Sequence, residues 1–373
     1  MDTLNNYGAT PGALVSSGYQ YNNYRIMERL AAARGAAADQ QMLGSLADNL
    51  KLAFNARFLN TTTHIYQGDT QCGYVLALKF GLVPADQRDA VIEKLVDNIM
   101  VKNNGHLSVG LIGMQWLMQT LTDTGRADVA YTIATRTSRP SWGYMFSKGS
   151  TTIWERWDGD TRDPSMNSEA LLILAGNLDA WFYQTLAGIR PASDAFKTVM
   201  IKPEIVGNLT WARAHFDSPY GRISSDWKID SATQVSLTCA VPPNASAVVH
   251  FPLTTLRNAT IRENGIPIWV NCSFIGGVPG ISYAGADAKS ARFTVGSGTY
   301  AFSATGIAIV IDPPLITVVV DNDDPGTHLT GSWTREVISE ADQRFGASFA
   351  YAVAGNGSNQ AQFRPNLPVA GSY

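Results

Sequence analysis

The chain changes fold class after the stretch WFYQTLAGIRP, residues 181–191, which ends its last apolar helical pattern. Upstream, helix-length segments are separated by Gly, Asn, Asp or Pro, which punctuate helices. These predicted helices cover residues 24–34, 41–58, 71–80, 86–100, 111–122, 127–135 and 166–186. Within 86–100, apolar residues from Val91 to Ile99 repeat at the spacing of one buried helix face. Residues 1–196 therefore form a predicted helical domain.

Several of these helices are apolar nearly all round, as in YVLAL at residues 74–78. A helix of that kind is buried on more than one side. This suits the inner ring of a layered helical barrel better than a single small bundle.

Downstream of Pro191 the pattern becomes short alternating stretches, which are typical of β-strands. They cover residues 198–201, 210–216, 221–229, 234–240, 247–251, 259–263, 291–295, 299–304 and 307–311. DSPYG at 217–221 has hairpin chemistry, because Pro fixes φ and Gly allows positive φ. Residues 197–313 are predicted to form an antiparallel β-sandwich. Pro313 and Pro314 mark a joint to a third segment, 314–373.

Charge and hydropathy exclude several classes of function. A chain of 373 residues with a net charge of −3 has no electrostatic footprint for nucleic acid. No apolar run reaches membrane-spanning length, so no membrane partner is expected. Cys72, Cys239 and Cys272 match no metal-ligand spacing, and neither metal nor cofactor is expected. Cys239 and Cys272 could meet within the β domain, whereas Cys72 lies in an apolar helical run.

The N-terminus MDTLNN lacks the basic and apolar regions of a signal peptide. Asn-x-Ser/Thr sequons nevertheless occur along the chain, for example at Asn208, Asn258 and Asn356. They favour an extracellular or cell-surface location for a longer parent protein.

The stretch STTIWERWDG, residues 150–159, places a carboxylate between two indoles and beside an arginine. A sugar ring presents C–H faces that stack on indole, and its anomeric carbon needs an acid or base beside it. Glu155 is therefore a candidate catalytic carboxylate. It could equally pair with Arg156 or Arg162 at a junction between a loop and a helix.

The order of residues here resembles the catalytic domain of glycoside hydrolase family 78 α-L-rhamnosidases. The similarity spans roughly residues 15 to 300. It is carried by PSWGYM at 140–145, GSTTIWERWDG at 149–159, MNS at 166–168, WFYQTLAGI at 181–189, LTWA at 209–212 and DSPYGRISSDW at 217–227. The resemblance implies an (α/α)6 barrel followed by a C-terminal β-sandwich, here with only part of the barrel.

The resemblance also implies inverting hydrolysis of terminal α-L-rhamnosides, with rhamnose-containing glycosides or polysaccharides as partners. Glu155 matches the family's general base, which activates water opposite the leaving group. The implied substrate-binding residues are Trp142, Trp154, Trp157, His106 and Asn167. Each tryptophan is also a plausible core residue, and a lone histidine more often makes local structural hydrogen bonds.

Two departures from the family pattern leave other functions open. No stretch before Tyr21 resembles the acidic motif that carries the family's general acid. Ala170 and Leu171 stand where the family usually has Asn and His, and leucine cannot donate a hydrogen bond. The alternatives are an impaired remnant that binds carbohydrate, or another (α/α)6 enzyme such as a polysaccharide lyase, which would use a Tyr, His or Lys base.

The third segment resembles the start of a golvesin or xanthan-lyase C-terminal β module. VDNDDPG at 320–326, TGSW at 330–333 and NLP at 366–368 carry this similarity. Trp333 could be a carbohydrate platform or a core residue. A partial barrel would also leave faces such as 74–78 uncovered, which predicts possible self-association.

Overall fold

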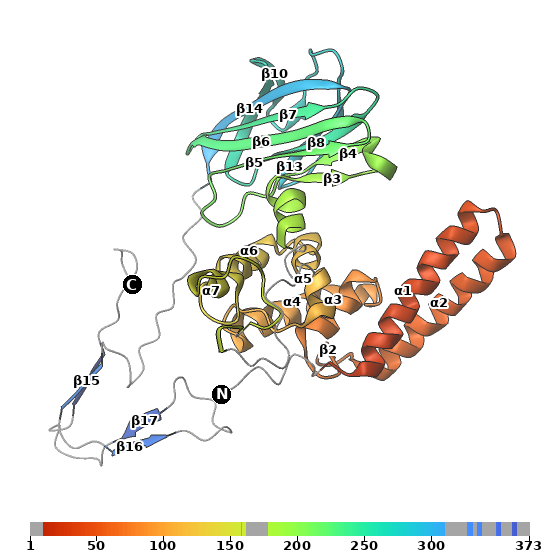
Figure 1. The fold of residues 1–373 in the computed structure, drawn as a ribbon. Helices are drawn as coiled ribbons and strands as arrows, with labels where there is room; N and C mark the ends of the chain where they lie inside the picture. The colour runs from red at the N-terminus through yellow and green to blue at the C-terminus, as the bar shows by residue number, and fades with distance from the viewer. Residues whose placement is uncertain are drawn as a thin grey trace. The chain divides into compact units, whose positions relative to one another are not determined.

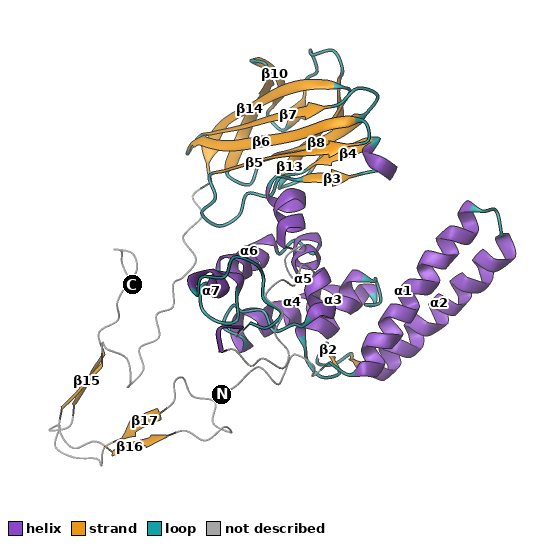
Figure 2. Cartoon of the chain, viewed as in Figure 1, coloured by secondary structure: helices purple, strands orange, loops and turns teal. Residues whose placement is uncertain are grey.

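The computed structural model describes residues 10–157, 159–161 and 178–309, and the backbone of four short strands between residues 327 and 363. Its main helices precede its two large sheets, and a short strand pair, β1 (Leu59–Asn60) with β2 (Ile65–Tyr66), lies among the helices (Figures 1 and 2). The main helices are α1 (Gly12–Ala33), α2 (Ala37–Phe58), α3 (Gln71–Lys79), α4 (Arg88–Asp97), α5 (Leu111–Asp123), α6 (Ala127–Thr135) and α7 (Trp142–Ser147). Short π-helices follow α4, at Asn98–Lys102 (η3), and precede the first sheet strand, at Phe182–Leu186 (η5).

Helices α1 and α2 form a long antiparallel hairpin (Figure 1). Helix α1 starts twelve residues before the position that the sequence pattern predicts, 24, because Pro11 is compatible with its first turn. Arg25 links the two helices, since it bonds Glu28 on α1 and Asp48 on α2. Gly44 gives the close approach, because a Cβ there would lie 2.8 Å from the Glu28 carboxylate.

The expectation that the face of residues 74–78 is uncovered is wrong. Tyr74 to Leu78 are buried, because α3 is packed against α1, α4 and α5. Several exposed large apolar side chains lie on the hairpin instead: Ile26, Met27, Leu30, Met42, Leu46 and Leu52. Self-association stays a prediction, and these residues are where it would originate.

Two sheets form the sandwich. The seven-stranded sheet has the order β11-β10-β9-β14-β7-β6-β5, and the five-stranded sheet has the order β12-β13-β8-β4-β3. The strands are β3 (Ile189–Pro191), β4 (Thr198–Ile201), β5 (Trp211–Ser218), β6 (Gly221–Ser231), β7 (Gln234–Val241), β8 (Ser246–Pro252), β9 (Leu256–Glu263), β10 (Ile266–Val270), β11 (Ser273–Phe274), β12 (Ile281–Ala286), β13 (Ser290–Val295) and β14 (Gly298–Ala308). The predicted helical domain followed by a β-sandwich is confirmed.

The pairing is antiparallel throughout these two sheets, except that β4 runs parallel to β8. The predicted hairpin at 217–221 is present, with Ser218 opposite Gly221. The predicted break between strands 299–304 and 307–311 is absent, because β14 runs without interruption to Ala308 and its register against β9 shifts between Thr305 and Ile307. A bulge therefore accounts for the apparent break in the alternating pattern. Residues 310 and 311 lie outside the described residues.

Aromatic side chains dominate the sandwich core. Phe251, Phe293 and Phe302 are buried there, and the rings of Phe293 and Phe302 stack with centroids 5.9 Å apart. Cys239 is buried on β7, whereas Cys272 is exposed, and both are free thiols, so the possible disulfide is absent. Cys72 lies in the helical core, as predicted.

A short segment joins the helices to the sandwich. The indole Nε1 of Trp181 donates to Thr122 Oγ1 on α5 at 2.8 Å. The indole Nε1 of Trp227 on β6 donates to the Leu186 carbonyl at 2.7 Å. Between these two contacts, Gly188 turns the chain into β3 with φ of 79°.

The region beyond residue 309 forms a separate compact unit. Its described backbone contains two antiparallel pairs. β15 (Thr327–Thr330) pairs with β18 (Gln360–Phe363), and β16 (Thr334–Val337) pairs with β17 (Ser348–Tyr351). Trp333 lies outside the described residues, and the assignment of residues 314–373 to a golvesin or xanthan-lyase module stays a prediction.

None of the helices in the described part of the chain combines the length and the apolar character that a membrane crossing requires.

Gly188→Ala should destabilise the protein by about 2–5 kcal/mol. A Cβ at this position would lie 2.2 Å from backbone atoms of Lys202 and Pro203, which adds overpacking to the cost of a left-handed residue. Gly265→Ala is the matched control, because φ there is 82° but nothing lies within 4 Å. The control should lose only about 1–2 kcal/mol in urea unfolding. Equal losses would contradict the clash.

The pH dependence of the unfolding free energy should depend on the protonation of His250 on β8. Burial lowers the pKa of His250 to about 4, with Lys202 and Arg292 adding to the effect and Asp287 opposing it. Between pH 6.5 and 4 the unfolded chain therefore binds a proton that the folded chain does not, so stability falls as pH drops through this window. His250→Gln should flatten the curve of urea midpoint against pH. If the slope of the urea midpoint against pH were unchanged in this variant, a group other than His250 would be responsible for the pH dependence.

Candidate active site

The loop that carries Glu155 folds back onto α7. Ser141 caps this helix, because its Oγ accepts from the Tyr144 amide at 2.9 Å. Tyr144 in turn donates its hydroxyl to Asp160 Oδ2 at 2.8 Å, and Lys148 lies 3.7 Å from the same carboxylate. One short helix therefore holds the far end of the loop.

All three predicted tryptophans are buried in the helical core. Trp142 is 1%, Trp157 4% and Trp154 9% exposed. The rings of Trp142 and Trp157 meet edge to face, with centroids 5.7 Å apart. A Cβ at Gly159 would lie 2.7 Å from the Trp154 ring, so glycine permits this close packing. The loop is thus anchored by indoles, and a role of these rings as sugar-contacting walls stays a prediction.

Glu155 lies between two of these anchors and is itself exposed. Its neighbours Trp154 and Trp157 point into the core, so the backbone at Glu155 is held from both sides while its carboxylate lies at the surface. Asn167, Ala170 and Leu171 lie outside the described residues.

A cavity of about 440 Å³ adjoins this loop. Trp142, Gly143 and Phe146 of α7 line one part of it, and the end of α6 lines another. Residues 151–153 contribute as well, so the lining reaches the residue before Trp154. The indole Nε1 of Trp142 is buried without a hydrogen-bond partner, an arrangement that costs about 1–3 kcal/mol.

His106 makes local structural contacts. Its Nδ1 lies 3.0 Å from the Asn103 carbonyl and its Nε2 lies 2.7 Å from Ser138 Oγ. Its own carbonyl accepts from Gln71 Nε2 at 3.1 Å. Nδ1 therefore contacts its own turn and Nε2 ties that turn to the loop before α7, which favours the structural interpretation over direct sugar contact.

Sequence reasoning missed α7 and several residues of the cavity wall. Phe146, Asp179 and Phe182 line the cavity but belong to none of the predicted site residues. The sequence feature that could have identified α7 is Ser141 after Pro140, because Ser is a preferred residue at the start of a helix. Among the described residues, no group of three or more His, Cys, Asp or Glu could hold a metal ion.

Comparison with known proteins places this arrangement in a family. Residues 2–186 match the bacterial α-L-rhamnosidase 6 hairpin glycosidase domain, and residues 188–265 match the bacterial α-L-rhamnosidase C-terminal domain. The chain belongs to the glycoside hydrolase family 78 α-L-rhamnosidases. The helical part of this rhamnosidase-family chain and its sandwich thus correspond to two successive family domains.

The rhamnosidase-family chain is similar to an α-L-rhamnosidase of Streptomyces avermitilis. It is 38% identical over 67% of this chain and 24% of that protein. The crystal structure of the Streptomyces avermitilis α-L-rhamnosidase complexed with L-rhamnose has a TM-score of 0.69 at 33% identity, covering 79% of this chain and 27% of that one. This chain therefore spans about a quarter of the length of that relative.

A second kind of similarity is partial. The rhamnosidase-family chain is 37% identical to a xanthan lyase of Bacillus sp. (strain GL1) over 97 residues, which are 25% of this chain and 10% of that protein.

Trp142 and Trp157 should be energetically coupled if they act as one core pair. A double-mutant cycle with Trp142→Leu and Trp157→Leu should give a coupling of about 1 kcal/mol in urea unfolding, because an edge-to-face pair contributes about 0.5–1.5 kcal/mol beyond its buried area. The control cycle pairs Trp157→Leu with Phe251→Leu, which lies in the sandwich core. If the control cycle gave a coupling as large as that of Trp142 with Trp157, a specific contact between the two indole rings would be ruled out.

Proposed function

We propose that this chain carries the general base of an inverting α-L-rhamnosidase, and that Glu155 is that base. The strongest support is the way in which its neighbours in the loop position Glu155. Glu155 is an exposed residue, while the indoles on both sides are buried. A general base must be held in place yet remain accessible to water and substrate, and this arrangement provides both.

The neighbouring cavity supports the same role. Its lining runs from Trp142 through residues 151–153 and therefore ends close to Glu155 along the chain. A cavity of about 440 Å³ has the size of a small-molecule site. In inverting hydrolysis the base removes a proton from a water molecule as that water attacks the anomeric carbon, while an acid protonates the leaving oxygen.

No stretch before Tyr21 resembles the acidic motif that carries the family's general acid. A substrate whose leaving group needs little protonation is therefore the sensitive probe. We expect hydrolysis of p-nitrophenyl α-L-rhamnoside to exceed hydrolysis of a natural alkyl rhamnoside. An extracellular or cell-surface parent protein is part of the same proposal.

Glu155→Gln should lower kcat for p-nitrophenyl α-L-rhamnoside by about 10²- to 10⁴-fold, because the amide keeps the shape of the side chain but cannot accept the proton. Release of p-nitrophenol measures the rate. Glu93→Gln is the matched control, because Glu93 is an exposed carboxylate on α4 that pairs with Arg126. It should leave kcat unchanged.

Two outcomes would contradict the proposal. Turnover that survives Glu155→Gln would show that another residue is the base. Absence of turnover in the unmodified chain, together with rhamnose binding in calorimetry, would favour a carbohydrate-binding remnant.

A further inference from the structure

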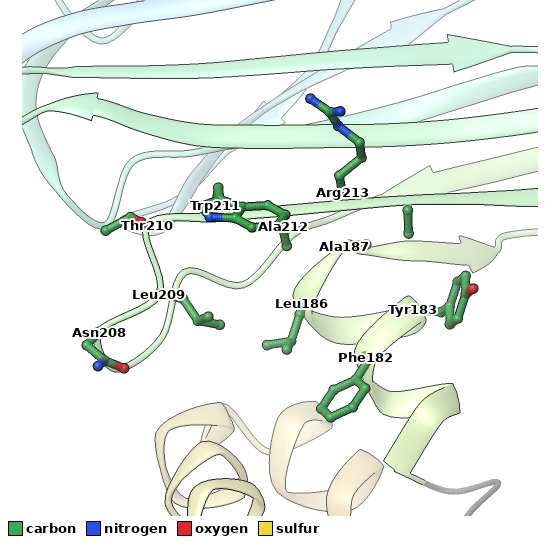
Figure 3. Close-up of a pocket in the computed structure, with 11 residues that line it drawn as sticks. Phe182, Tyr183, Leu186, Ala187, Asn208, Leu209, Thr210, Trp211, Ala212 and Arg213 are labelled. Atoms are coloured by element: carbon green, nitrogen blue, oxygen red, sulfur yellow. The ribbon is translucent and has the colours of Figure 1, made fainter.

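Two adjoining cavities lie along β5, and none of the residues described in the Glu155 loop lines them. The first, of about 540 Å³, is lined by η5 and by residues 208–214 (Figure 3). The second, of about 440 Å³, is lined by residues that include Phe196 and His215–Asp217. Both include Tyr183, and β5 supplies their walls one after the other. We call this pair of cavities the β5 groove.

Strand β5 is an edge strand, since it ends the seven-stranded sheet and pairs there only with β6. Natural edge strands are usually protected by charge, proline or cover. Strand β5 carries exposed charged side chains at Arg213 and Asp217, and large aromatic rings are exposed as well. Trp211 is 61%, Tyr183 46% and Phe216 40% exposed. Tyr183 and Trp211 line the first cavity, and Tyr183 and Phe216 line the second. Side chains alternate along a strand, so Trp211 and Phe216 leave β5 on opposite faces.

Figure 3 shows how the first cavity is built. Phe182 and Leu186 extend from η5 toward the loop that carries Leu209, while the indole of Trp211 lies along the strand above. Arg213 points away from them, toward the neighbouring strand. The apolar surface therefore faces the space between helix and strand, and the amide of Asn208 lies at its rim.

The charges of the groove are compensated within the sheet. Arg213 donates to Asp226 on β6 at 2.6 Å, and Arg222 donates to Asp217 at 2.8 and 3.1 Å. A polyanion or a charged peptide would find no uncompensated partner in these two pairs. The remaining groups are aromatic faces together with amide, hydroxyl and imidazole groups at Asn208, Thr210 and His215.

We propose that the β5 groove binds a neutral oligosaccharide. A sugar chain offers apolar C–H faces for the exposed rings and hydroxyls for the polar rim, and it requires no charged partner. The two cavities in sequence along β5 provide room for more than one sugar unit. Binding here does not depend on Glu155 acting as a base, so it can be tested apart from hydrolysis.

The test is calorimetric titration of the full chain, in a Glu155→Gln background, with an α-linked rhamnose oligosaccharide and with free L-rhamnose. We expect the oligosaccharide to bind more tightly than the monosaccharide. Trp211→Ala should weaken oligosaccharide binding by about tenfold, and Trp211→Tyr should restore most of it. Phe216→Ala should weaken binding of the oligosaccharide more than binding of rhamnose.

Ile266→Ala is the control, because Ile266 is an exposed apolar residue on β10, near the other end of the same sheet. It should leave affinity unchanged. Thermal unfolding followed by circular dichroism verifies that each variant is folded. The proposal would be overturned if Trp211→Ala bound the oligosaccharide as tightly as the chain without this substitution. It would also be overturned if the folded chain without this substitution bound no oligosaccharide. Neither result bears on the kcat test of Glu155, because that test measures hydrolysis.

Discussion

The hydrogen bond from the Trp227 indole to the Leu186 carbonyl joins the two structural halves of the first 309 residues. Leu186 ends η5, where the carbonyls of a helix lose their intrahelical partners. Trp227 is fully buried at the centre of β6, where its indole N–H would be costly to leave unpaired. At 2.7 Å the contact satisfies both groups at once. Because the same indole also fills the sandwich core, the end of η5 and the packing of the sheet are fixed together.

A second link acts beside it through Asp123 at the end of α5. Lys79 and Arg190 each lie 3.1 Å from this carboxylate, so α3, α5 and β3 converge there. Burial alone would raise the pKa of Asp123, but the hydrogen bond from Gln119 and the two cations outweigh it and lower the pKa. The carboxylate therefore stays ionised where the helical region meets the first strand. Arg190 also donates from Nε to the Gln184 carbonyl at 2.6 Å, so the same side chain links η5 to α5 and β3.

The sequence predicted those features that depend on local periodicity. The pattern in residues 86–100 identified the side chains that α4 and η3 bury, from Val91 to Ile99. It did not predict the π-helical end at Asn98, because that end depends on a bond from the Asn98 side chain to the distant Asp69 carbonyl. Helix α7 was missed because six residues are too few to show a period. Glu155 was proposed from its aromatic neighbours and the family resemblance, and its role stays a prediction, because indoles have the same sequence pattern whether they line a sugar site or fill a core.

The burial of those indoles changes how the candidate site must be understood. Rings that are nearly fully buried position the loop, and most of the wall of the adjoining cavity comes from other residues. Phe182 is one of them, because it lines both the cavity beside the Glu155 loop and the first cavity of the β5 groove. It belongs to η5, the element that Trp227 and Thr122 hold through Leu186 and Trp181. The contacts that join the helices to the sandwich therefore also position Phe182, which is the one described side chain that lines both cavities.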